Sequence, residues 1–170
     1  MNIVLIGYRG AGKSTVGEVI ARRLGWELKC LDAMIIQKAK MSIPAIVEQF
    51  GWDRFRDLEA EALAEAVAGD RQVLDCGGGI ILRPENRDAL KKSGKVVWLT
   101  AEVETIASRL ADTNDRPSLT GASFIDEIAA VLAEREEMYR EAADVIVATD
   151  GKSSERVADE ALAGLGLPGR

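Results

Sequence analysis

The segment GYRGAGKST, residues 7–15, carries the most specific chemical signal in the chain. It matches the pattern G-x-x-x-x-G-K-[ST] through Gly7, Gly12, Lys13 and Ser14. Glycines permit positive φ, so successive backbone N–H groups can point at one anion, and the start of a following helix adds positive potential. In this pattern the lysine reaches the β- and γ-phosphates and the hydroxyl binds Mg²⁺. The segment therefore predicts a nucleoside-triphosphate site.

Further polar groups are expected at one edge of a sheet. Asp32 stands where a second strand should end, and Gly77, Gly78 and Gly79 follow a third. Ligands of open α/β sheets bind at the carboxyl ends of the strands. Three consecutive glycines indicate that a ligand approaches the backbone closely. An acceptor site beside the phosphate loop is therefore predicted.

Three arginines are candidates for binding a small anion. Arg56 lies in GWDRFRDLE, and Arg135 and Arg140 lie in EREEMYREAAD, just before the last predicted strand. Guanidinium groups bind carboxylates in a planar, charge-assisted way. Each arginine taken alone is equally compatible with a solvated helix surface.

Composition excludes several other classes of function. The chain has no histidine, so acid–base chemistry must rest on carboxylates, Lys, Tyr or Cys. A net charge of −6 argues against a general nucleic-acid binder. We see neither a signal peptide nor an apolar run of about 18 residues, so we expect a cytoplasmic protein with no membrane contact. In that compartment Cys30 and Cys76 should be free thiols.

Segments of strand and helix character alternate along the chain. Strands are predicted at residues 2–6, 26–31, 72–76, 95–100 and 144–149. Helices are predicted at residues 13–24, over a broken region at about 32–69, from Pro84, at 102–110, at 123–142 and after the last strand. Residues 112–122 are rich in turn formers and are predicted to form a loop. This alternation predicts one three-layer α/β domain over residues 1–170, with a parallel sheet covered on both faces.

The ordered set of motifs resembles the shikimate kinase family over nearly the whole chain. The matching pieces are the N-terminal phosphate loop, Asp32 followed by MSIPAIV, FR at 55–56 with Glu59, GGG at 77–79, RPSLTG at 116–121 and YR at 139–140. The resemblance implies a P-loop kinase fold with five parallel strands in the order 2-3-1-4-5. It also implies Mg²⁺-dependent transfer of the ATP γ-phosphate to the 3-hydroxyl of shikimate, in aromatic amino-acid biosynthesis.

The resemblance assigns acceptor roles to particular residues. Asp32 would hold the shikimate hydroxyls, including the attacking one. Arg56 and Arg140 would bind the carboxylate. Gly78, flanked by Gly77 and Gly79, would bind the ring through its backbone. The helical region at about 32–69 would carry much of this site.

On the nucleotide side, the resemblance implies a phosphate cradle and a lid. The cradle is Gly10, Ala11, Gly12, Lys13, Ser14 and Thr15. Arg116 would close over the phosphates from a lid at about 112–122, and would be catalytic together with Lys13 and Asp32. Arg109 and Lys152 would lie near the adenine.

The chain departs from the family pattern at Cys30, where the first acid of Asp-x-Asp usually helps to hold Mg²⁺ through water. Cysteine is a poor substitute, because Mg²⁺ prefers oxygen ligands. Asp75, at the end of the third strand, is a candidate replacement that would serve the metal together with Ser14. The alternative is that Asp75 only caps the glycine turn. A second departure is TDGKSSE after the fifth strand, which lacks a proline that often covers the base.

Two other readings stay open at this point. A kinase for another small hydroxy acid such as gluconate would share the loop and the fold, but it would not require Arg56, the triple glycine and Arg140 together. A non-catalytic nucleotide-binding module would explain the acid lost at Cys30, but the intact Lys13, Asp32 and Arg116 argue against it. We expect a monomer, since no long exposed apolar stripe is apparent.

Overall fold

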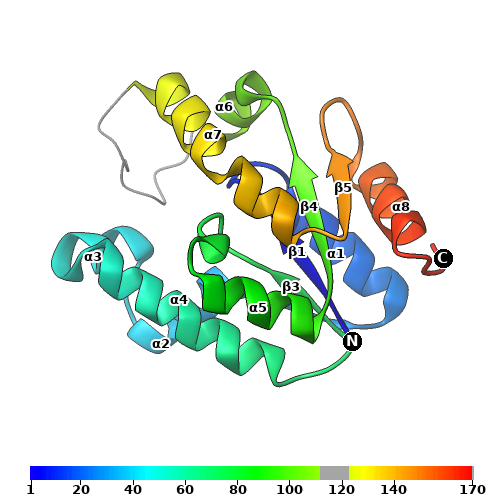
Figure 1. Cartoon of the computed structure of the whole chain (residues 1–170), viewed down its shortest axis with the longest axis horizontal. Helices are drawn as coiled ribbons and strands as arrows, with labels where there is room; N and C mark the ends of the chain where they lie inside the picture. The colour runs from blue at the N-terminus through cyan, green and yellow to red at the C-terminus, as the bar shows by residue number, and fades with distance from the viewer. Residues whose placement is uncertain (112–122, 170) are drawn as a thin grey trace.

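A five-stranded parallel sheet forms the centre of the computed structural model, which describes residues 1–111 and 123–169 (Figure 1). The strands are β1 (Asn2–Ile6), β2 (Glu27–Cys30), β3 (Gln72–Asp75), β4 (Gly94–Thr100) and β5 (Val145–Ala148). Their order is β2-β3-β1-β4-β5, and every neighbouring pair is parallel, as predicted. The carboxyl ends of all five strands therefore meet at one edge, and the phosphate loop leaves β1 there.

Helices connect the strands and cover both faces of the sheet. They are α1 (Lys13–Leu24), α2 (Leu31–Ala39), α3 (Ile43–Phe50), α4 (Trp52–Val67), the short 3-10 helix η1 (Ile80–Leu82), α5 (Pro84–Ser93), α6 (Val103–Leu110), α7 (Phe124–Ala142) and α8 (Ser154–Gly164). Within the described ranges, no helix is long and apolar enough to cross a membrane.

The breaks expected in the region 32–69 separate α2, α3 and α4. Ser42 caps α3 by accepting a hydrogen bond from the backbone N–H of Ala45, and Pro44 stands in the first turn of that helix. Gly51 takes a φ of 86°, which permits the sharp change of direction between α3 and α4. The chain then continues into α4, which carries Arg56.

Alternate residues of β1 supply the two halves of the core. Val4 and Ile6 pack with residues of α2 to α5 and α7 on one face. Ile3 and Leu5 pack with α1 and α8 on the other. All four side chains are fully buried, which explains the continuous apolar run of this strand.

Candidate active site

Glycines shape the phosphate loop between β1 and α1. Gly7, Gly10 and Gly12 have φ values of 142°, 81° and 98°, in the region that side chains disfavour. A Cβ atom on Gly7 would also lie 2.4 Å from the carbonyl oxygen of Leu99. Gly12 caps α1 without a side chain, and the first turn of the helix holds no acidic residue. The first N–H groups of α1 are therefore suited to an anion.

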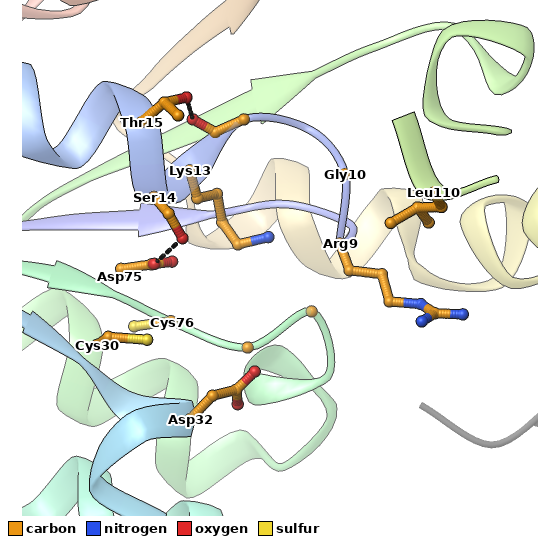
Figure 2. Close-up of a pocket in the computed structure, with 13 residues that line it drawn as sticks. Arg9, Gly10, Lys13, Ser14, Thr15, Cys30, Asp32, Asp75, Cys76 and Leu110 are labelled. Carbon is orange, nitrogen blue, oxygen red and sulfur yellow. Dashed lines mark hydrogen bonds between the residues drawn. The ribbon is translucent and has the colours of Figure 1, made fainter. Parts of the chain in front are cut away.

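Lys13 is buried against this loop. Its Nζ donates to the backbone oxygens of Gly7 at 2.8 Å and Tyr8 at 3.0 Å, and only 7% of the residue is exposed. These bonds aim the ammonium group across the cavity below the loop, as Figure 2 shows. The cavity has a volume of about 250 Å³, and Asp32 and the residues of the predicted phosphate cradle other than Ala11 line it. Its lining is Arg9, Gly10, Gly12, Lys13, Ser14, Thr15, Cys30, Asp32, Asp75, Cys76, Gly77, Gly78 and Leu110.

Ser14 is in direct contact with Asp75. The Ser14 hydroxyl donates to Oδ2 of Asp75 at 2.6 Å, and Asp75 is 6% exposed (Figure 2). Burial raises the pKa of the Asp75 carboxyl, while the nearby Lys13 charge and the Ser14 hydrogen bond act in the opposite direction. A buried carboxylate thus lies beside the hydroxyl that the loop pattern assigns to the metal.

Both cysteines are free thiols, as predicted, and both line this cavity. Cys30 is the register partner of Asp75 across the β2–β3 pair. Burial raises the pKa of the Cys30 thiol, and so do the charges of Asp75 and Asp32 nearby. Burial also raises the pKa of Cys76 well above its ordinary value. These surroundings favour the neutral thiol over the thiolate.

Asp32 faces the same cavity from another element. The second strand ends one residue earlier than predicted, at Cys30, and Leu31 begins α2. Asp32 therefore lies in the first turn of α2, where the positive end of the helix favours a carboxylate. In Figure 2 its side chain extends toward the space between the phosphate loop and the glycine turn.

Arg56 is held against the glycine turn by its own helix. Its Nη1 forms an ion pair with Oε1 of Glu59 at 2.9 Å, and the two side chains are 14% and 1% exposed. The guanidinium lies so close to Gly79 that a Cβ atom there would be 2.1 Å from Nη1. Arg56, its partner Glu59 and Gly79 therefore lie together, and the acceptor role of Arg56 and the three glycines stays a prediction.

Arg135 of α7 reaches the same turn from the opposite side. It is 7% exposed, and its Nη1 lies 3.4 Å from the position of a Cβ atom on Gly78. The buried Tyr139 hydroxyl donates to the Gly78 carbonyl oxygen. Burial raises the pKa of Tyr139 to about 12 despite the opposing charge of Arg135, so this hydroxyl remains a donor at neutral pH. Two guanidinium groups thus flank Gly78 and Gly79.

The placement expected for Arg140 beside Arg56 is wrong. Its guanidinium pairs with Glu136 at 3.0 Å and lies 5.5 Å from the centre of the Trp98 ring. Arg140 lines a separate cavity of about 490 Å³ between α6, α7 and the end of the sheet. The reason is helical phase, because Arg135 and Tyr139 are four residues apart on the buried face of α7 and Arg140 is turned away from it.

Another cavity, of about 310 Å³, lies between the phosphate loop, Arg109 and the segment from Thr149 to Val157. Arg109 and Lys152 both line it, and their place near the adenine stays a prediction. Arg109 donates to the Gly10 backbone oxygen at 2.9 Å and to the Thr149 hydroxyl at 3.1 Å. Lys152 pairs with Glu160 at 2.8 Å. Arg116 and the predicted lid at 112–122 lie outside the described residues.

The sheet order, the glycine loop before α1 and the arginines at the glycine turn define a P-loop small-molecule kinase. The family model for shikimate kinase matches residues 9–165. The chain belongs to the shikimate kinase family.

Individual relatives agree with this assignment. A shikimate kinase from Nitratidesulfovibrio vulgaris is 46% identical over 87% of this chain and 86% of its own length. The solved shikimate kinase from Acinetobacter baumannii in complex with shikimate is 35% identical, covers 96% of this chain and 92% of its own, and superposes with a TM-score of 0.93. A gluconokinase from Sinorhizobium meliloti is 21% identical with a TM-score of 0.58, covers 97% of this chain and 91% of its own, and shares the fold alone.

Proposed function

We propose that the chain transfers the γ-phosphate of ATP to the 3-hydroxyl of shikimate, giving 3-phosphoshikimate and ADP in the aromatic amino-acid (chorismate) pathway. The observation that carries this proposal is the pair of guanidinium groups, the half-buried Arg56 and the buried Arg135, beside a glycine turn that faces the phosphate loop. Family membership indicates that the acceptor is shikimate. The two guanidinium groups explain how its carboxylate would be bound.

The acceptor side would act by binding and orientation. Arg56 and Arg135 would bind the shikimate carboxylate through charge-assisted hydrogen bonds, with little loss of side-chain freedom because both are already held in place. The Gly78 backbone would contact the ring. Asp32 would accept a hydrogen bond from the attacking hydroxyl and orient it. In a loose phosphoryl transition state the nucleophile forms little bond, so its orientation matters more than its early deprotonation.

The donor side would bind and neutralise the triphosphate. The N–H groups of Gly10 to Thr15 and the ammonium group of Lys13 would hold the β- and γ-phosphates. The oxygen donors at the cavity fit Mg²⁺, and the Ser14 hydroxyl would be a ligand. When bound, Mg²⁺ would neutralise charge on the phosphate oxygens. Arg109 and Lys152 would lie toward the base, and the role of Arg116 stays a prediction.

We further propose that residues 1–170 act as one P-loop kinase domain. Within it, α2, α3 and α4 would carry the acceptor side. We expect the protein to work in the cytoplasm as a monomer, with ATP and shikimate as its small-molecule partners and no nucleic acid.

A coupled ADP-release assay tests the proposed function. Purified protein is given ATP and Mg²⁺ with shikimate, with gluconate, or with no acceptor. We expect saturable turnover with shikimate and only background ADP release in the other two arms. Turnover with gluconate alone would refute the acceptor assignment. Tight ATP binding without turnover in every arm would favour a non-catalytic nucleotide-binding module.

Replacing Gly79 with alanine should weaken shikimate binding without unfolding the protein. The new Cβ atom would occupy the place of the Arg56 Nη1, so the end of the arginine side chain would have to move away from the turn. Losing one charge-assisted contact costs about 1.5–3 kcal/mol, so the KM for shikimate should rise by roughly 10- to 100-fold. Steady-state kinetics and the thermal unfolding midpoint measure both effects. Gly169→Ala, near the chain end, is the control and should change neither.

Replacing Tyr139 with phenylalanine should raise the KM for shikimate by about fivefold, because one buried hydrogen bond to the Gly78 carbonyl is lost. Tyr139 is a positioning residue, so the KM for ATP should stay unchanged. A parallel rise in both KM values would instead show a general loss of packing. Separate titrations of shikimate and ATP distinguish the two results.

A further inference from the structure

We propose that the magnesium-associated carboxylate of this chain is Asp75 on β3, and that the Cys30 thiol on β2 takes no part in binding the metal. The proposal deepens the proposed function and rests on it only in assuming that the phosphoryl donor is a magnesium–nucleotide complex.

The first support is the contact between Ser14 and Asp75. The two residues come from different elements, the first turn of α1 and the last residue of β3, yet their side-chain oxygens are 2.6 Å apart. P-loop enzymes commonly hold Mg²⁺ with the loop Ser or Thr and an acid on a neighbouring strand. Asp75 therefore already lies within reach of a metal bound at the Ser14 hydroxyl.

Sheet topology gives the second support. The phosphate loop follows β1. The strand β3 lies directly beside β1, and β2 is separated from β1 by β3. Cys30 and Asp75 are register partners at the ends of these two strands. A carboxylate at position 75 thus stands nearer to the loop than one at position 30. The oxygen of Asp75 also suits a hard cation, and the sulfur of Cys30 does not.

Charge gives the third support. Asp75 is 6% exposed, and Lys13 is the nearby positive charge that acts on it. Asp32 lines the same cavity, as Figure 2 shows, and adds a second negative group. No group of three or more acidic, His or Cys side chains among the described residues is arranged to hold a metal alone. Phosphate oxygens and water would complete the coordination, as is usual for Mg²⁺ at nucleotide sites.

Mn²⁺ binding to the ADP complex tests the proposal without any acceptor. Electron paramagnetic resonance measures free Mn²⁺ during titration of the ADP-saturated protein, and metal-free ADP affinity is measured separately by calorimetry. Asp75→Asn should weaken Mn²⁺ binding at least tenfold and leave metal-free ADP affinity within about twofold. Asp88→Asn, at an exposed position on α5, is the matched control and should change neither value.

A second variant separates loss of the charge from loss of the fold. Cys30→Asp combined with Asp75→Asn returns a carboxylate to the neighbouring strand end, so it should recover most of the lost Mn²⁺ affinity. Unchanged Mn²⁺ affinity in Asp75→Asn would overturn the proposal. An equal loss of metal-free ADP affinity would also overturn it, because Asp75 would then only support the loop. Neither result depends on which acceptor the enzyme uses.

Discussion

Replacing Lys13 with methionine should lower kcat by about two to three orders of magnitude at saturating ATP and shikimate. The ammonium group is held in place by two backbone oxygens before any ligand binds, so it can meet the charge that develops on the transferred phosphoryl group. Losing one such preorganised donor typically costs a factor on the order of 10²–10³ in kcat. Methionine keeps the length of the side chain and removes the charge. The coupled ADP-release assay measures the effect.

Two controls show whether the loss of activity in Lys13→Met comes from the missing ammonium group. Lys91→Met, at an exposed position on α5, should retain the activity of the unchanged protein. Circular dichroism at the assay temperature should show that the Lys13→Met protein is folded. A folded Lys13→Met protein that keeps more than about a tenth of the original kcat would contradict the role assigned to Lys13.

Replacing Arg135 with methionine should lower kcat/KM for shikimate by about 100-fold. Arg135 is one of two guanidinium groups beside the glycine turn, and hydrogen bonds to a charged ligand contribute about 1.5–3 kcal/mol. The loss should appear mainly in the KM for shikimate, because the carboxylate is bound equally in the ground state and the transition state. The KM for ATP should change little. Steady-state titration of each substrate measures the two effects.

Arg140→Met is the matched control on the same helix. Arg140 pairs with Glu136 and lies over Trp98, so its loss should change kcat/KM by no more than about twofold, as for an exposed ion pair. The reverse pattern, with Arg140 essential and Arg135 dispensable, would contradict the site described above.

The strand order and the phosphate loop were predictable because both depend on local signals. Buried parallel strands appear as continuous apolar runs such as NIVLI, and the glycines of the loop occupy backbone conformations that other residues disfavour. The contact between Ser14 and Asp75 was also predictable, because strand ends and loop meet at one sheet edge once the order is known.

To decide whether Arg135 or Arg140 lies at the glycine turn, one must know which face of α7 is buried. Both arginines are close to Tyr139 in sequence, and neither is marked by its own neighbours. The buried positions Ile128, Val131, Arg135, Tyr139 and Ala142 follow a spacing of three or four residues. Extending that apolar face through the charged segment would have placed Arg135 on it. The second strand ends at Cys30, one residue before the predicted end at Leu31, and a difference of this size is usual at element boundaries.

Product identification from a competition reaction tests the central claim most directly. Equal concentrations of shikimate and gluconate are incubated with ATP, Mg²⁺ and the protein, and the products are identified by mass spectrometry and ³¹P NMR. The structure and the family assignment predict a single phosphorylated organic product, shikimate carrying phosphate on its 3-hydroxyl, formed in equal amount to ADP. Phosphorylated gluconate, phosphate on another shikimate hydroxyl, or ADP accompanied only by free phosphate would contradict it.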